Sequence, residues 1–127
     1  MDEARENAFE LVAGGRAVVV TTTEDVDLST ADGVQTKWER AAVAAVRAGA
    51  GLLIVDLRQV GFLSSVGISA LMLLSANCSL RGVELVLCMD EDQAVRRALD
   101  LTGVLSTALP ATTSVEDALQ RVLVDPA

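Results

Sequence analysis

The hexapeptide LLIVDL, residues Leu52–Leu57, constrains the fold more than any other part of the chain. Five of its six residues are apolar and show no alternation, which is typical of a strand that is covered on both faces in a parallel sheet. A β-branched run, Ala17–Thr23, precedes it, and between the two lies a segment from Thr30 to Ala48 whose apolar residues recur at helical spacing. The order strand, helix, strand predicts a crossover unit of an α/β fold.

The flanking segments extend this pattern in both directions. Phe9–Ala13 and the β-branched run read as a hairpin with Gly14 and Gly15 as a two-residue turn, and Ser29 with Asp32 resembles a capping box for the following helix. We therefore predict one α/β domain over residues 1–127, with its core at about 9–124. It should have a mixed sheet of about five strands opened by the hairpin, with about four helices packed on it. The remaining expected elements are a helix at Ile68–Leu80, a strand at Val83–Cys88, a helix at Gln93–Leu101, a weak strand at Ser106–Leu109, and a last helix capped by Ser114.

Charge and hydropathy limit the possible partners. The 127 residues carry a net charge of −8, which disfavours direct binding to nucleic acid and to anionic membranes, because both are negatively charged. The apolar runs are far shorter than the ~20 residues of a membrane-spanning helix, so no membrane insertion is expected. The acidic start MDEARE lacks the basic head of a signal peptide, and we expect a cytoplasmic protein.

The usual signs of catalysis are missing from the sequence. The chain contains no histidine, which removes the commonest general base and metal ligand. Cys78 and Cys88 form no C-x-x-C pair and are expected to be buried, reduced thiols. The segment GFLSSVG lacks the first glycine of a nucleophile elbow, the segment GAG at 49–51 precedes a strand where a phosphate loop would follow one, and Asp90 and Asp92 fall at an expected helix cap. We expect no enzyme and no cofactor or metal.

Ser64 and Ser65 lie where the apolar strand gives way to an amphipathic helix. A serine at such a junction is most often an N-cap, which accepts a hydrogen bond from a free amide of the first turn. Two adjacent serines exceed what capping needs. One of the two could project into solvent as a phosphate acceptor, where the positive end of the helix dipole tolerates added charge.

Three ordered segments resemble the STAS domain family, and in particular the bacterial anti-sigma factor antagonists. The segment VDLRQVGFLSSVGISALM is similar to the family signature V-D-L-S-x-V-x-F-x-D-S-S-G-x-x-x-L. The segment DVDLSTAD is similar to E-L-D-x-x-T, and VRRALDLTGVLSTALPATTSVEDAL is similar to the usual ending of the family. The resemblance runs from about residue 9 to residue 124.

This resemblance assigns roles to individual residues. It places the phosphorylated serine at Ser65 (with Ser64 as the alternative), the following glycine at Gly67, a buried aromatic at Phe62, and the aspartate of the earlier loop at Asp27. The sequence departs from the family pattern at Ser64, which replaces an aspartate, at Val66, which replaces a small residue, and at Glu24, which replaces a glycine. The partner-binding residues implied are Asp27, Ser29, Ser64, Ser65, Val66, Gly67, Ile68 and Ser69.

The resemblance implies a binding switch. The unphosphorylated chain would dock on an anti-sigma factor with serine-kinase activity, which then frees its sigma factor for transcription, and phosphorylation would reverse the docking. The free protein would be a monomer or a weak dimer. The alternative is a constitutive, unphosphorylated STAS subunit of a lipid-transport or sensory complex, a function compatible with Ser64 in place of the family aspartate.

Overall fold

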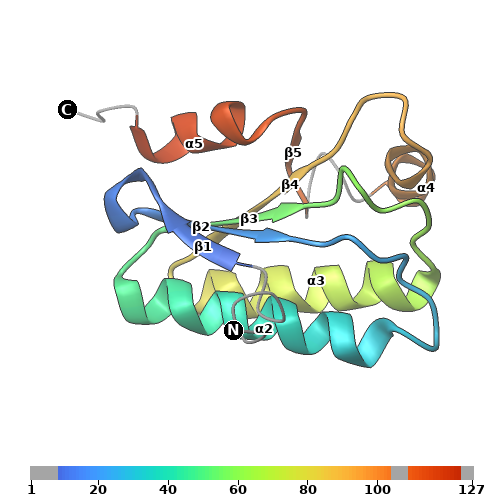
Figure 1. Cartoon of the computed structure of the whole chain (residues 1–127), viewed down its shortest axis with the longest axis horizontal. Helices are drawn as coiled ribbons and strands as arrows, with labels where there is room; N and C mark the ends of the chain where they lie inside the picture. Colours follow the sequence, from blue (N-terminus) through green and yellow to red (C-terminus); the bar gives the residue numbers. More distant parts are fainter. Residues whose placement is uncertain (1–8, 104–108, 124–127) are drawn as a thin grey trace.

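A computed structural model describes residues 9–103 and 109–123 of the chain. These residues form a five-stranded sheet with four α-helices packed around it (Figure 1), which confirms the predicted α/β fold class. Within them, no helix is long and apolar enough to cross a membrane. The strands are β1 (Phe9–Val12), β2 (Ala17–Thr21), β3 (Leu52–Asp56), β4 (Glu84–Cys88) and β5 (Ala111–Thr112), and the helices are α2 (Ala31–Ala48), α3 (Ser65–Leu80), α4 (Ala94–Thr102) and α5 (Val115–Leu123).

The sheet has the strand order β1-β2-β3-β4-β5. β1 is antiparallel to β2, and all other neighbours are parallel. At the carboxyl ends of the three central strands, Thr21 pairs with Asp56, and Asp56 pairs with Cys88. Because these strands end in register, the loops that follow them gather at one edge of the sheet, on the right in Figure 1.

Alternate residues of the central strands bury against opposite layers, as the period of two requires. One face, represented by Val18, Leu53 and Leu87, packs with α2, α3 and α4 into the larger core. The other face, represented by Ile54 and Val86, packs against the short helix α5. Both faces of β3 are therefore covered, which explains why its sequence is a continuous apolar run.

The turn of the hairpin differs from the two-residue turn predicted from Gly14 and Gly15. Ala13–Gly15 form a 3-10 turn, and Val12 pairs with Ala17, so four residues join the strands. Ala13 and both glycines have positive φ angles. The core fixes this register, because Ala17 and the residues that follow it in β2 point alternately into the two hydrophobic layers. The length of the turn follows from that register.

The predicted start of one helix was wrong. α3 begins at Ser65, three residues before the expected start at Ile68, because Ser64 supplies the cap. The weak strand predicted at Ser106–Leu109 lies outside the described residues for 106–108, and Leu109 itself is fully buried but belongs to no strand. The observed strand β5 follows it, with Leu87 N–H donating to Pro110 O at 2.9 Å and Met89 N–H donating to Thr112 O at 3.0 Å.

Candidate functional site

Ser64 and Ser65 take different positions at the start of α3. Ser64 is the N-cap: its backbone is extended, and its Oγ accepts a hydrogen bond from Gly67 N–H at 3.4 Å. Ser65 is the first residue inside the helix, and it is exposed. One hydroxyl therefore satisfies the helix end, while the other is open to solvent.

Gly67 allows the first turn of α3 to approach the preceding loops closely. A Cβ at this position would lie 2.5 Å from Leu63 Cδ1 and 2.9 Å from Val26 Cγ1, which is closer than real Cβ atoms approach other atoms. Gly67 is buried, whereas its neighbours Ser65 and Val66 are exposed. The glycine is thus required for packing beneath the site, and this explains its place after the two serines.

The loop before α2 is bound directly to the loop before α3. Val26 forms a parallel bridge with Leu63; its N–H donates to Phe62 O at 2.9 Å, and its carbonyl accepts from Ser64 N–H at 2.8 Å. Asp25 reinforces this connection, since its Oδ1 accepts from the N–H groups of Gly61 at 2.8 Å and Phe62 at 3.1 Å. These contacts fix the backbone that leads into Ser64 and Ser65.

The sequence did not identify Asp25 as a site residue. Three acids within the four residues 24–27 mark the segment, but no local pattern distinguishes the carboxylate that reaches the other loop from the one that stays in its own. The interpretation from the resemblance selected Asp27, which has a different role.

Asp27 shapes the entry into α2. Its Oδ1 accepts from Ser29 N–H at 2.8 Å, from Ser29 Oγ at 2.7 Å and from Thr30 N–H at 3.1 Å. These bonds, with the Ser29 hydroxyl first, hold the pKa of Asp27 below its ordinary value. The predicted capping box of Ser29 and Asp32 is therefore wrong, because the Ser29 hydroxyl donates backwards to Asp27 and the N-cap residue is Thr30.

Three apolar side chains are exposed on the loops before α2 and α3 and in the first turn of α3. Leu28 is 83% exposed, Phe62 52% and Val66 40%. The expectation that Phe62 is a buried aromatic is thus contradicted: the peptide group of Phe62 is bound by Asp25 and Val26, while its ring stays largely in solvent. Exposed apolar side chains such as Phe62 and Val66, close to Ser65 along the chain, are typical of a protein-binding surface when they form a patch.

The loop after β4 joins the same edge of the sheet. Gln93 Nε2 donates to the carbonyl oxygens of Leu57 and Val60, both at 2.7 Å, and Gln93 Oε1 accepts from Asp90 N–H at 3.0 Å. Gln93 thereby ties this loop to the chain that follows β3. The sequence pattern predicts a helix start at Gln93 but gives no signal for this contact across the edge.

The edge is strongly acidic. Its three loops, residues 22–30, 56–64 and 89–93, hold seven acidic residues and one arginine, which gives −6 of the chain's net charge of −8. The arginine, Arg58, is occupied by a two-point ion pair with Asp56, with bonds of 3.0 Å and 2.8 Å. The acidic residues are Glu24, Asp25, Asp27, Asp56, Asp90, Glu91 and Asp92.

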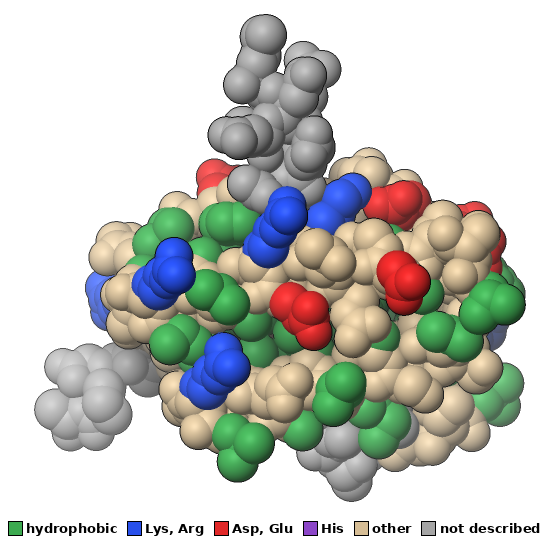
Figure 2. All heavy atoms as spheres, turned by 90° about the horizontal axis from the view of Figure 1, so that it is seen from below, with side chains coloured by type: hydrophobic (Ala, Val, Ile, Leu, Met, Phe, Trp, Pro, Cys, Tyr) green, Lys and Arg blue, Asp and Glu red, His purple; other side chains and the backbone are tan. Residues whose placement is uncertain are grey.

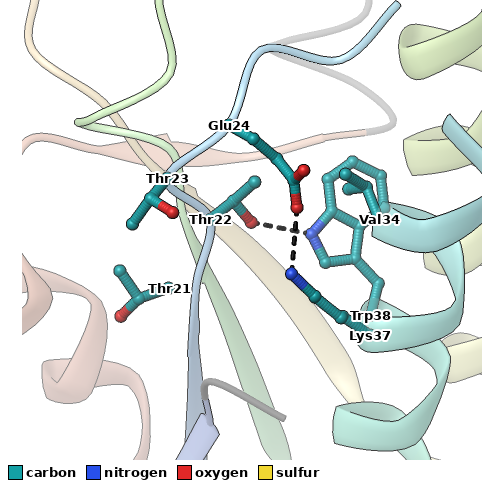
Figure 3. Close-up of a pocket in the computed structure, with 7 residues that line it drawn as sticks. All are labelled: Thr21, Thr22, Thr23, Glu24, Val34, Lys37 and Trp38. Carbon is teal, nitrogen blue, oxygen red and sulfur yellow. Dashed lines mark hydrogen bonds and ion pairs between the residues drawn. The ribbon is translucent and has the colours of Figure 1, made fainter. Parts of the chain in front are cut away.

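A small cavity of about 170 Å³ lies beside this edge, between the end of β2 and α2 (Figure 3). The ion pair of Lys37 Nζ with Glu24 Oε1, at 2.9 Å, crosses its mouth, and Trp38 Nε1 donates to Thr22 Oγ1 at 2.9 Å. The cavity is below the ~300 Å³ that small-molecule sites usually need. Four of its seven lining residues form these two pairs, and we assign the cavity to packing. Across the described residues there is no cluster of three acidic or cysteine side chains able to hold a metal ion.

The residues predicted to bind a partner lie at this one edge. Asp27 and Ser29 lie in the loop before α2, which Val26 and Asp25 bind to the loop that ends in Ser64. The other predicted residues lie in the first turns of α3, where Ser65, Val66 and Ser69 are exposed, Ile68 is partly buried against the core, and Gly67 is buried.

Comparison with known families supports the interpretation of the sequence. The model of the STAS domain matches residues 8–118, which is most of the chain. The protein belongs to the STAS domain family. No curated protein matches it in sequence.

Several solved structures share the fold along nearly the whole length of this chain. An anti-sigma factor antagonist from Mycobacterium paratuberculosis is 27% identical, with a TM-score of 0.68 over 91% of this chain and 92% of that one. A putative anti-sigma factor antagonist from Thermotoga maritima is 14% identical, with a TM-score of 0.74 over 91% and 93%. The phosphorylated form of the Bacillus cell fate determinant SpoIIAA is 16% identical, with a TM-score of 0.61 over 91% and 99%. These last two likenesses concern the fold.

Proposed function

We propose that this STAS domain is an anti-sigma factor antagonist whose docking is switched by phosphorylation of Ser65. The partner would be an anti-sigma factor with serine-kinase activity. It would transfer the γ-phosphoryl group of ATP to Ser65 Oγ, with a base of the kinase taking the hydroxyl proton and ADP leaving. The chain itself would act by binding and not by catalysis, in the cytoplasm of a bacterium.

The observation that carries this proposal is that the two serines have different roles. Ser64 is committed to the N-cap, and Ser65 is exposed one residue later, beside exposed Phe62 and Val66. A kinase needs a hydroxyl that its own active site can reach, and Ser65 meets that need without disturbing the cap. Two relatives named as anti-sigma factor antagonists, and a third solved in a phosphorylated form, lend further support.

The start of α3 can accept a phosphate without unfolding. The first-turn amides of a helix have no intrahelical acceptor, and they carry the positive end of the helix dipole. A phosphoserine adds a charge of about −1.5 to −2, which this position tolerates better than the middle of a helix does. The phosphorylated chain should therefore keep the same fold.

In the complex, the same phosphate would weaken binding and release the kinase. Inside a docked surface it would lose water and lie next to the nucleotide phosphates of the kinase, so that its charge is both desolvated and repelled. A penalty of about 1.4 kcal/mol lowers affinity tenfold, so a few kcal/mol separate the two proteins. The acidic edge around Ser65 favours a partner with a basic docking face, because opposite potentials speed and orient association.

The test compares the two serines directly. The wild-type chain, Ser65→Ala and Ser64→Ala are each incubated with an anti-sigma factor kinase of the same organism and ATP, and phosphate is located by mass spectrometry. We expect modification of the wild type and of Ser64→Ala at Ser65, and none of Ser65→Ala. Ser65→Ala should still bind the kinase in calorimetry, but ATP should no longer release it. Phosphate found at Ser64 alone, or at neither serine, would refute the proposal.

One observation favours a second function, that of a constitutive subunit of a lipid-transport or sensory complex. Ser64 stands where the resembled antagonists carry aspartate, so the edge lacks a carboxylate next to the acceptor. In such a complex the same apolar patch would bind permanently. Purification of the tagged chain from its own cells distinguishes the two, since an ATP-binding transporter subunit that stays bound in the presence of ATP would favour the second.

A further inference from the structure

The outer face of α3 carries no charge at all. None of its sixteen residues is acidic or basic, in a chain with 22% charged residues. Val66, Leu73 and Leu80 are 40%, 52% and 85% exposed, and they alternate with the small, exposed residues Ser69 and Ala76. This spacing of three and four residues forms one stripe along the helix, with large and small side chains in turn. We call it the α3 stripe.

The neighbouring helix α2 presents charges of both signs in an ordered way. Asp32 and Glu39 are exposed in its first half, and Arg40 and Arg47 are exposed in its second half. Figure 2 looks onto the layer formed by these two helices, with basic side chains gathered toward the left and acidic ones toward the middle and right. Hydrophobic side chains lie between them and along the lower part of this face.

We propose that this face binds a second copy of the same chain, with the helices of the two copies antiparallel. α2 and α3 lie side by side beneath the sheet in Figure 1, and both run from right to left. A two-fold axis that lies in the plane of contact and crosses the middle of both helices places each helix against its own counterpart in the second copy. α2 then packs on α2 and α3 on α3, each pair antiparallel. Arg47 of the second copy then lies opposite Asp32, and its Arg40 lies opposite Glu39.

The same rotation matches the α3 stripe to itself. Leu73 lies near the axis and packs beside Ala76 of the second copy, while Val66 lies beside the last turn of the second α3. Large side chains thus meet small ones, which lets two helices approach to the usual 8–10 Å. No charge is buried along this line, because the stripe contains none.

Charge explains why self-association would use this face. A net charge of −8 opposes contact through most of the surface, and most strongly through the acidic edge that surrounds Ser65. On the helix layer, the acidic half of each α2 instead faces the basic half of α2 in the other copy. Two helices of 16 and 18 residues give a face roughly 25 Å long and 20 Å wide, or about 1,000 Å² buried in total, which is the low end for specific interfaces. The expected dimer is weak and reversible.

Cross-linking of the full chain tests the orientation. Val66→Cys and Leu80→Cys proteins are prepared separately and treated with a short bismaleimide linker, alone and mixed; the native Cys78 and Cys88 are 2% and 0% exposed and should not react. In the antiparallel dimer two copies of residue 66 lie roughly 20 Å apart, whereas residue 66 lies beside residue 80. We expect dimers from the mixture and few from either protein alone.

The control pairs Leu80→Cys with Leu101→Cys, since Leu101 is 89% exposed but belongs to α4. This mixture should cross-link at least tenfold more slowly than the first. Equal rates in the two mixtures, or a preferred link between two copies of residue 66, would overturn the proposed arrangement.

Sedimentation of the unmodified chain supplies the second measurement. We expect the mass to rise from the monomer value of 13.3 kDa toward twice that value with concentration. Arg47→Asp should lower the association constant about tenfold, because it places Asp32 opposite another acid. The double variant Asp32→Arg with Arg47→Asp restores opposite charges and should recover most of the association. A chain that stays monomeric throughout, or a single reversal without effect, would refute self-pairing and leave the face to a different protein.

Discussion

Asp25 Oδ1 accepts a hydrogen bond from the backbone N–H of Gly61 at 2.8 Å, across 36 residues of sequence. The same oxygen accepts from Phe62 N–H. One carboxylate thus orients the peptide groups that lead into Ser64 and Ser65, and it does so from the loop before α2. The position of the exposed serine therefore depends on a contact between two loops and not only on the helix that begins there.

Replacing Asp25 with alanine should loosen this connection. The variant leaves two loop amides to water, and because the bonds are exposed we expect a loss of only about 1 kcal/mol in the free energy of unfolding. The local effect should be larger: the amides of Gly61 and Phe62 should exchange hydrogen much faster than in the wild type. Urea unfolding measures the free energy, and hydrogen-exchange mass spectrometry measures the exchange of the two amides. Unchanged exchange in both amides would show that the Val26 bridge alone holds the loop.

Gly67 and Gly33 form a matched pair of helical glycines for testing close packing. Gly67→Ala should lower the free energy of unfolding by about 1–3 kcal/mol, since its Cβ would meet Leu63 and Val26 at under 3.0 Å. Gly33→Ala in α2 meets nothing within 4 Å and should stabilise the protein by up to about 1 kcal/mol through helix propensity. Both follow from urea unfolding curves. Gains of similar size at the two positions would contradict the crowding at Gly67.

The central elements could be predicted from the sequence because their signals are local. The run Leu52–Leu57 became a strand at Leu52–Asp56, and the helical segment Thr30–Ala48 became α2 at Ala31–Ala48. In both, apolar spacing within a few residues decides the element and its burial. The cap of the last helix was also predicted from its residues, and Asp117 N–H donates to Ser114 Oγ at 3.0 Å.

The site was harder to predict from the sequence, because its geometry depends on contacts between segments that are distant along the chain. The exposure of Phe62 results from the binding of its peptide group by Asp25 and Val26, which no local pattern encodes. The strand β5 is only two residues long, and its pairing with β4 decides where it lies. The resemblance pointed to both serines, but only the structure separates the capping serine from the exposed one.

Stability at low pH should depend on Asp27. In the folded chain its pKa lies below the ordinary value. Its carboxylate therefore stabilises the fold at any pH above that ordinary value, and this contribution is lost as the pH falls through the pKa of the folded chain. Asp27→Asn removes this contribution to stability. The urea midpoint of the wild type should exceed that of the variant at pH 6, and the gap should close below about pH 4. A gap that is constant from pH 6 to pH 3 would contradict the prediction.

The two thiols should be unreactive until the protein unfolds. Burial raises the pKa of the Cys88 thiol to about 11, with the negative charge of Asp56 adding to the effect, and burial also raises the pKa of Cys78. With a pKa near 11, about one Cys88 thiol in a thousand is ionised at pH 8. We expect Ellman's reagent to react at least a hundredfold faster in denaturing urea than with the native chain. Rapid release of one equivalent from the native chain would contradict the buried placement.

Ser64 and Ser65 should respond oppositely in stability and in phosphorylation. Ser64→Ala removes a cap whose bond is long, at 3.4 Å, so we expect a loss near the low end for caps, about 0.5–1 kcal/mol in the free energy of unfolding. Ser65→Ala replaces an exposed residue of the first turn and should change that free energy by less than about 0.5 kcal/mol. Phosphorylation by an anti-sigma factor kinase should show the reverse, persisting in Ser64→Ala and disappearing in Ser65→Ala. Ser64→Asp is the informative third variant, because an aspartate also caps a helix and places a negative charge at its positive end, which should raise stability above that of Ser64→Ala. If Ser65→Ala proved the more destabilising of the two, Ser65 and not Ser64 would be the structural serine, and the assignment of the exposed hydroxyl to the switch would have to be reversed.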